Sequence, residues 1–213
     1  SISRQRNPAA TNVDSQAVEG AVDLAYEFPA RRTQWVPQPA GIPLGFWRSV
    51  GSSINTFVVE SMIDELADEA GKDPFEFRRN MLLHNERLLR LFDKLDAMSA
   101  WRKTLPAGRA WGMAYSRAFN THVAQVAEVS SPSAGTIMVH RVACAVDCGR
   151  AVNPGQIEAQ MQGSVLHGMS AALWGKVTFT AGRSSVRNFD NYKMVKRGDA
   201  PVVTVGISDS GAL

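Results

Sequence analysis

Two segments of the sequence combine residue types that could bind a polar or anionic ligand. The first is Gly45–Ser53, in which Trp47 and Arg48 stand among small residues just before a predicted helix start. Free backbone N–H groups at a helix N-terminus favour an anion, and small residues let a ligand approach the main chain. The alternative is an aromatic loop that only caps the following helix. The residues alone leave both interpretations open.

The second segment is 153–170, where Asn153 and Pro154 predict a helix start and the helix carries Gln156, Gln160 and Gln162. The helix is rich in small residues, which permit close packing against a neighbour. A glutamine on such a face can form paired hydrogen bonds with a polar heterocycle. From the residues alone, a helix packed on a sheet with solvent-facing glutamines is the favoured alternative.

No catalytic or metal-binding motif adds to these two segments. The sequence has no P-loop, no Gly-x-Gly-x-x-Gly and no Gly-x-Ser-x-Gly, and its four histidines show no metal-ligand spacing. Cys144 and Cys148 fall in a predicted strand, where four residues span about 13 Å, too far for a local disulfide. We interpret both as thiols of the core or its boundary.

Composition excludes several classes of protein. The 213 residues are 45% hydrophobic, which suffices for one sizeable core, and the net charge is only +3. The basic residues are scattered, whereas a nucleic-acid-binding protein needs a clustered basic face. No apolar stretch approaches the roughly 20 residues that span a bilayer. Neither end of the sequence resembles a natural terminus.

The pattern of the sequence predicts an α+β fold in three segments. Residues 1–45 are expected to form an irregular leader with short strands at 26–29 and 33–36. Residues 46–100 are expected to form a helical cluster, with helices at 56–70, 74–83 and 85–98. Apolar residues at helical spacing predict the inward face of the first helix: Val59, Met62, Ile63, Leu66, Ala67 and Ala70. In the third helix, the residues expected to point inward are Leu88, Phe92 and Leu95.

Residues 101–213 are expected to form an α+β portion with hairpins. Alternating runs at 122–129 and 137–146 flank good turn residues and predict a β-hairpin. The helix that starts at Asn153–Pro154 follows. A second hairpin turns at residues 181–183, and a last strand covers 202–207.

Together these segments resemble the xanthine oxidase family of molybdenum hydroxylases. The closer branch is that of the isoquinoline 1-oxidoreductase β-subunit and related aldehyde dehydrogenases. The chain is similar to a C-terminal fragment of the large, molybdopterin-binding subunit. The motifs that carry the resemblance are Gly45–Gly51, Phe57–Leu66, Gly71–Pro74 with Phe77–Arg79, Val123–Val129, and Asp147–Gly149 before Val152–Pro154.

The resemblance implies roles for four residues. Arg48 stands at the position of an arginine that contacts the cofactor. Trp47 and Val50 are expected to line the substrate channel, and Val50 replaces an aromatic residue of xanthine oxidases, which argues against a purine substrate. Gln160 stands where the family has a glutamine that hydrogen-bonds the pterin. This expectation replaces the solvent-facing interpretation of the helix.

The resemblance also implies the reaction. The expected activity is hydroxylation of an N-heterocycle or oxidation of an aldehyde, with water as the oxygen source and a glutamate as general base. That glutamate is expected beyond Leu213, so no catalytic residue and no metal ligand is assigned within the chain. Glu60 is interpreted as a structural partner, and Glu158 as a carboxylate that suits the start of its helix.

Cofactor and partners follow from the same resemblance. The cofactor is molybdopterin, with the cytosine dinucleotide form as one alternative, and 2Fe–2S clusters are expected on a partner subunit. The other partners are the remainder of the large subunit and a small-molecule substrate, without nucleic acid and without a membrane span. We expect a cytoplasmic protein, or alternatively a periplasmic one. The alternative function is a non-catalytic structural or assembly module, and the chain alone is expected to be inactive.

Overall fold

The structure, a computed structural model, describes residues 13–101 and 103–211. The chain divides into two compact units, one formed by Ser1–Leu89 and Tyr115–His122 and the other by Arg90–Ala114 and Val123–Leu213. The three segments expected from the sequence stay a prediction.

Hydrogen bonds of side chains, and not strand pairing, connect the leader to the rest of the first unit. The structure has no strand among residues 13–51, so the short strands predicted at 26–29 and 33–36 are wrong. Instead Tyr26 is buried and its hydroxyl donates a hydrogen bond to Glu60. The side-chain amide of Asn55 donates to the carbonyl oxygens of Ala17 and Glu19, at 2.9 and 2.8 Å.

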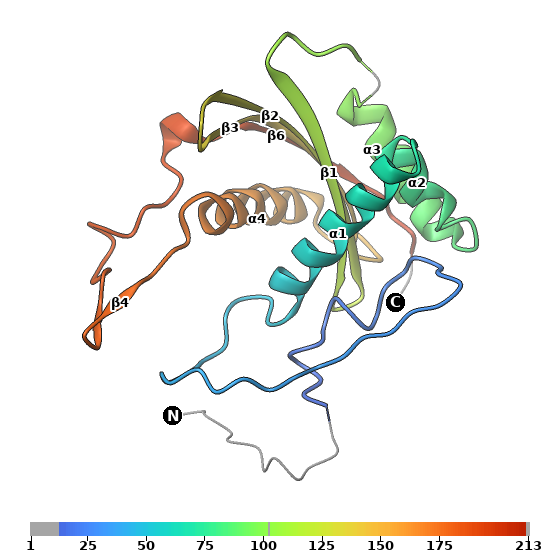
Figure 1. Cartoon of the computed structure of the whole chain (residues 1–213). Coiled ribbons are helices and arrows are strands. Elements are labelled where there is room, and N and C mark those ends of the chain that lie inside the picture. The colour runs from blue at the N-terminus through green and yellow to red at the C-terminus, as the bar shows by residue number, and fades with distance from the viewer. Residues whose placement is uncertain (1–12, 102, 212–213) are drawn as a thin grey trace. The chain divides into compact units, whose positions relative to one another are not determined.

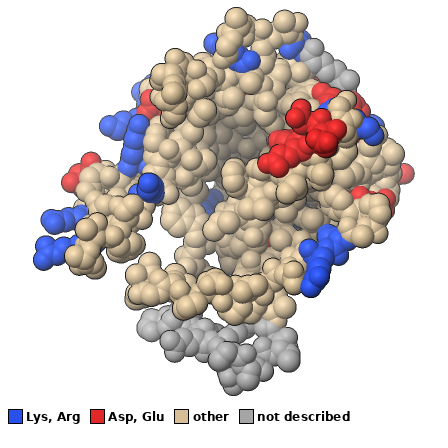
Figure 2. All heavy atoms as spheres, in the orientation of Figure 1, with Lys and Arg blue, Asp and Glu red and all other residues tan. Residues whose placement is uncertain are grey.

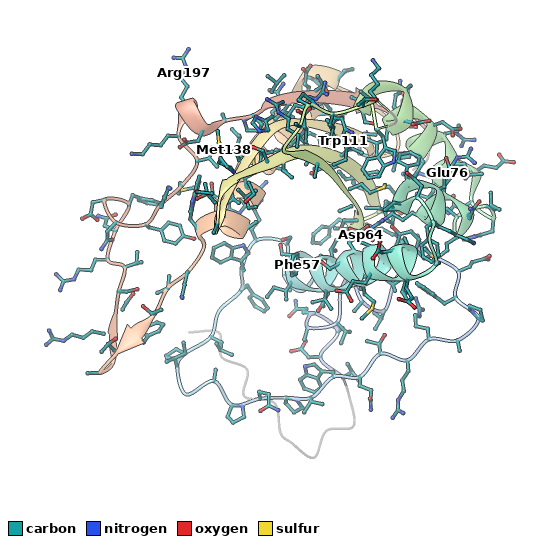
Figure 3. All side chains as sticks on the ribbon, turned by 45° about the horizontal axis from the view of Figure 1, so that its top comes forward. Phe57, Asp64, Glu76, Trp111, Met138 and Arg197 are labelled. Atoms are coloured by element: carbon teal, nitrogen blue, oxygen red, sulfur yellow. The ribbon has the colours of Figure 1, made fainter. Side chains whose placement is uncertain are left out.

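Helix α1 (Ser52–Glu69) buries only part of the face that its apolar residues predict. Ile63 and Ala67 are buried as expected, but Met62 is 52% exposed and Leu66 43% exposed. The buried face includes the carboxylate of Glu60. Figure 3 labels Phe57 and Asp64 on this helix. The predicted stripe is therefore wrong in part, because a buried ion pair fixes which side of the helix faces inward.

The next two helices follow the sequence prediction closely. Helix α2 (Pro74–Asn80) begins where expected, with the Asp73 carboxylate accepting hydrogen bonds from the backbone of Phe75 and Glu76. It ends three residues earlier than predicted. Helix α3 (Glu86–Ser99) carries the three expected inward residues, all fully buried: Leu88, Phe92 and Leu95.

Four strands form one mixed sheet in the order β1-β2-β3-β6. The strands are β1 (Arg109–Ala118), β2 (Thr121–Ser133), β3 (Thr136–Asp147) and β6 (Val202–Ile207). The predicted hairpin is β2 and β3, whereas β1 was not predicted. Two-residue connections join β1 to β2 and β2 to β3, and such short connections join antiparallel strands. Strand β6 pairs parallel to β3.

The parallel pair is connected through α4 (Pro154–Trp174), which packs on β3 and β6 (Figure 1). The predicted cap is confirmed, because the Asn153 side chain accepts a hydrogen bond from the backbone of Gln156 at 3.1 Å. The predicted second hairpin is also confirmed as β4 (Phe179–Thr180) and β5 (Arg183–Ser184). The α+β fold class is therefore confirmed.

The core of the second unit lies along β3, whose residues from Val142 to Asp147 are all buried. Cys144 is buried within this run and Cys148 is half-buried after it, and both thiols are free, as predicted. Burial raises the pKa of the Cys144 thiol to about 11. Helix α3 approaches β6 at Gly206, where an added Cβ would lie 2.7 Å from the sulfur of Met98.

Candidate cofactor site

Trp47, Arg48 and Val50 lie together in a tight loop immediately before α1. The backbone N–H of Val50 donates to the Trp47 carbonyl at 3.0 Å, and that of Ser52 donates to Ser49 at 3.0 Å. Ser49 and Val50 have φ angles of 70° and 51°. This left-handed region is rare for a β-branched residue and costs roughly 1–3 kcal/mol. The loop conformation is therefore imposed by its surroundings.

The leader supplies part of that constraint at Gly51. A Cβ at this position would lie 2.4 Å from the carbonyl oxygen of Gln16 and 3.2 Å from the backbone of Ala17. Only glycine permits so close an approach of two backbone segments. The adjacent Asn55 amide bonds to the same stretch of leader. The backbone of residues 16 and 17 in the leader thus packs against the loop at Gly51.

The loop exposes two aromatic side chains and one basic side chain to solvent. Phe46 is 64% exposed and Trp47 53% exposed, and Arg48 is exposed as well. In the described part of the chain, the Arg48 guanidinium makes no hydrogen bond or ion pair. A guanidinium keeps its charge at all physiological pH values and offers five donors in a planar fork. It can therefore bind carbonyl or phosphate oxygens.

Gln160 occupies an exposed position in the first half of α4. Its amide makes no hydrogen bond to any described residue, whereas the amide of Gln162 donates to Glu158 at 3.2 Å. A Cβ added at neighbouring Gly163 would meet nothing within 4 Å. The Gln160 amide is therefore solvent-exposed, with no described residue packed against the neighbouring Gly163. Glu158 is exposed and engaged by Gln162.

The two parts of the predicted site belong to different compact units. The structure brings Trp47, Arg48 and Val50 together in the first unit, and it places Gln160 in the second. The binding roles of these four residues stay predictions.

Glu60 is the centre of a buried network in the first unit. Its carboxylate accepts hydrogen bonds from Arg78 Nε at 2.9 Å, from the Tyr26 hydroxyl at 2.9 Å and from the backbone of Tyr115 at 2.8 Å. The Arg78 guanidinium also donates to the Glu60 carbonyl at 2.9 Å and to Asp64 at 2.6 Å. These hydrogen bonds connect residues of the leader, α1, α2 and β1. The network supports the structural role expected for Glu60.

The burial of Glu60 and the hydrogen bonds to both of its oxygens argue against a role as general base. Burial raises the pKa of its carboxyl group, and the Arg78 guanidinium opposes that effect. Because three donors converge on the carboxylate, we expect it to remain ionised at neutral pH. Burial also raises the pKa of Tyr26 well above its usual value. Both oxygens of this carboxylate are engaged and shielded from solvent, so a substrate has no access to them.

A second charged cluster, in the second unit, was missed by the sequence analysis. The carboxylate of Glu128 on β2 binds Arg109 on β1 and Arg141 on β3, and only 2% of its side chain is exposed. The Arg141 guanidinium also lies 5.0 Å from the ring centroid of Trp111. Hydrogen bonds from Arg109 lower the pKa of Glu128, and those from Arg141 add to this. These residues become neighbours only once β1 is known to pair with β2.

Charge and metal-ligand geometry give no further site. Among the described residues, no group of three or more His, Cys, Asp or Glu side chains could hold a metal ion. On the face drawn in Figure 2, the largest group of acidic side chains lies right of centre and others lie apart from it, while lysines and arginines are scattered.

No helix within residues 13–101 and 103–211 combines the length and apolar character needed to cross a bilayer.

The family of the chain is shown by comparison with known proteins. The molybdopterin cofactor-binding domain family matches residues 57–201, which is more than half of the chain. The chain therefore belongs to the molybdopterin cofactor-binding domain family. The resemblance to xanthine oxidase family large subunits stated from the motifs is confirmed.

Three relatives define the branch. The chain is 31% identical over 191 residues to the beta subunit of isoquinoline 1-oxidoreductase from Brevundimonas diminuta, covering 88% of this chain. It is 28% identical to a membrane-bound aldehyde dehydrogenase (pyrroloquinoline-quinone) of Gluconacetobacter polyoxogenes, over 76% of this chain. It is 29% identical to the B subunit of nicotinate dehydrogenase from Pseudomonas putida, over 74% of this chain. The expected likeness to isoquinoline oxidoreductase and aldehyde dehydrogenase large subunits is confirmed.

The relatives are several times longer than this chain. The chain spans 24%, 23% and 15% of the lengths of the three proteins, in the same order. Two of the three are named as one subunit of a larger enzyme.

The exposed polar groups fit a pterin cofactor in their chemistry. Arg48 supplies cationic donors without a partner among the described residues, and Gln160 supplies an amide that both donates and accepts. Molybdopterin carries a carbonyl oxygen and ring nitrogens on its pterin and a phosphate on its side chain, which are complementary to these groups. The two residues predicted from the motifs are therefore suitable ligands for the cofactor that gives the family its name.

Proposed function

We propose that this chain is a cofactor-binding portion of the large subunit of a molybdenum hydroxylase. The enzyme hydroxylates an N-heterocycle or oxidises an aldehyde, with water as the source of oxygen. The observation that carries the proposal is the family match over residues 57–201. The relative from Brevundimonas diminuta, which aligns over 88% of the chain and is named for its action on isoquinoline, favours an N-heterocyclic substrate.

In this proposal the chain contributes binding and orientation. Arg48 holds an oxygen of the cofactor by charge-assisted hydrogen bonds, which are stronger than neutral ones. Gln160 forms paired hydrogen bonds with the pterin. When bound, molybdopterin supplies the redox chemistry that no amino-acid side chain can provide.

Substrate selection would depend on the loop before α1. Val50 is held in a left-handed conformation that fixes the direction of its side chain, and Trp47 beside it presents a large exposed ring. A valine at this position removes an aromatic surface on which a purine could stack, so a substrate of different shape is expected. A 2Fe–2S subunit and the remaining part of the large subunit complete the proposed enzyme.

The test is to purify the complete subunit that contains this segment and to measure molybdenum per chain by mass spectrometry. Pterin is measured in the same samples by its fluorescence after oxidation. We expect one molybdenum and one pterin per chain, and oxidation of isoquinoline or an aromatic aldehyde with an artificial electron acceptor. An active preparation without molybdenum would refute the proposal.

The isolated 213-residue chain provides a second test. It spans about a quarter of its relative from Brevundimonas diminuta, so it should hold only part of the cofactor's contacts. We expect no tight binding of molybdopterin by the isolated chain in equilibrium dialysis. Tight one-to-one binding would show that the residues of this chain form a complete pocket, contrary to the proposal.

A further inference from the structure

A buried carboxylate joins the ends of the two parallel strands in the second unit. Asp147 is the last residue of β3 and is fully buried. Its Oδ1 accepts a hydrogen bond from the backbone N–H of Gly149 at 2.9 Å and another from the hydroxyl of Ser210 at 2.8 Å. One bond reaches into the loop that leads to α4. The other reaches 63 residues along the chain, to the segment after β6.

The strand register explains why these groups meet. Val146 pairs with Ile207 at the ends of β3 and β6. The pairing continues one step further, because the backbone N–H of Ser208 donates to the Val146 carbonyl at 2.8 Å. Asp147 is therefore brought beside the chain as it leaves β6. Ser210, two residues further on, is close enough to donate its hydroxyl.

The buried position of the Asp147 carboxylate is energetically costly. Burial of a charged group costs several kcal/mol unless hydrogen bonds compensate for the lost water. An apolar side chain would fill the same space without that cost. What the carboxylate adds is direction, because hydrogen bonds to a charged acceptor are short, strong and geometrically specific.

The location of Asp147 connects it with the proposed function. Ligands of sheets with parallel strands bind beyond the carboxyl ends of those strands. Both segments that leave the carboxyl ends of β3 and β6 are bonded to one oxygen of Asp147. The first segment passes through the Asn153 cap into α4, the helix that carries Gln160. The second is the segment after β6.

We propose that Asp147 is a positioning residue, which fixes the loop before α4 and the segment after β6 relative to each other at the carboxyl ends of β3 and β6. The benefit to cofactor binding rests on the proposed function. The positioning itself rests only on the contacts within the second unit. It can therefore be tested on the 213-residue chain without cofactor.

The test is amide hydrogen exchange by NMR on five proteins: the wild-type chain, Ser210→Ala, Asp147→Asn, Asp147→Ala and the control Ser208→Ala. Ser210→Ala removes the bond to the segment after β6 and leaves the carboxylate in place. We expect its Ser208 amide to exchange about tenfold faster, the effect of losing roughly one such bond. Amides of α2 should be unchanged. The control should exchange as the wild type does, because the Ser208 side chain makes no hydrogen bond to a described residue.

Asp147→Asn distinguishes positioning from bulk stabilisation. An asparagine keeps the accepting Oδ1, so protection of the Gly149 amide should remain within about threefold of wild type. Asp147→Ala should lose that protection. If Ser210→Ala leaves exchange at Ser208 unchanged, the proposal is overturned. It is also overturned if Asp147→Asn accelerates exchange uniformly along β3 and α4. Neither outcome depends on molybdenum content, so failure of the proposed function would be seen separately.

Discussion

Arg78 Nε donates a hydrogen bond to Glu60 Oε2 across 2.9 Å, and the arginine side chain is completely buried while that of the glutamate is 6% exposed. The pair connects α2 to α1. The same carboxylate binds Tyr26 from the leader and the backbone of Tyr115 in β1. The Glu60 carboxylate thus connects α1 to α2, to the leader and to β1.

Removing one member of this pair should be strongly destabilising. Arg78→Met leaves a buried carboxylate without its counter-charge, and such changes cost about 3–5 kcal/mol. Chemical denaturation monitored by circular dichroism measures the change in the free energy of unfolding. We expect Glu60→Gln to cost less, because its one amide oxygen still accepts from the Tyr115 backbone and Arg78 keeps Asp64 as a counter-charge.

Asp64→Asn is the matched control for the Arg78 variant. Asp64 binds the same guanidinium, but its side chain is 46% exposed. Exposed ion pairs contribute roughly 0–1 kcal/mol. If Asp64→Asn destabilised the protein as much as Arg78→Met does, the buried pair would not be the dominant contact.

The Glu128 cluster predicts a dependence of stability on pH. Its two arginines lower the pKa of the Glu128 carboxyl group in the folded state. The stabilisation is therefore fully present above the ordinary pKa of a glutamate in the unfolded state, and it is lost as the pH falls through the lower pKa of the folded state. The arginines stay charged throughout. Because their side chains are 35% and 49% exposed, we expect a contribution of only about 1 kcal/mol at pH 7.

Glu128→Gln tests this expectation when both proteins are denatured at a series of pH values. The difference in the free energy of unfolding should be constant between pH 6 and 8 and should shrink below the pKa of the unfolded state. A difference that is the same at pH 3 and pH 7 would show that the carboxylate charge contributes nothing.

Much of the fold could be predicted because its signals are local. The Asp73–Pro74 and Asn153–Pro154 pairs mark helix starts through capping and a fixed proline φ, and both are confirmed. The inward face of α1 could not be predicted from its apolar residues. A buried glutamate paired with an arginine 18 residues away decides that face, and no local pattern records such a pair.

The candidate site shows the same division. Arg48 and Gln160 were selected by motif resemblance; both are exposed, and their binding roles stay predictions. The Asp147 contacts could not be predicted, because they depend on the register between two strands separated by α4. Likewise the strain at Val50 is a property of backbone angles, which residue type alone would argue against.

The support of the loop before α1 can be tested at Gly51. Gly51→Ala places a methyl group 2.4 Å from the Gln16 carbonyl, so the leader must move. We expect a loss of about 1–3 kcal/mol in the free energy of unfolding. Gly45→Ala is the control in the same loop, since an added Cβ there meets nothing within 4 Å. Equal effects of both variants would show that the close approach at Gly51 is not a constraint.

Cofactor retention gives the most direct test of Gln160 and Arg48. Both side chains are exposed and bond to no described residue, so replacing them should leave the thermal unfolding temperature of the isolated chain unchanged. In the complete large subunit, Gln160→Ala should lower cofactor affinity about tenfold or more, the effect of losing one or two hydrogen bonds. Arg48→Lys keeps the charge but loses the planar fork, so it should also lower molybdenum content. The control is Gln162→Ala, which removes an amide already engaged by Glu158 on the same helix.

Molybdenum at the wild-type level in Gln160→Ala would show that this residue does not bind the pterin. A loss in Gln162→Ala equal to that in Gln160→Ala would show that the helix as a whole, and not the Gln160 amide, determines retention.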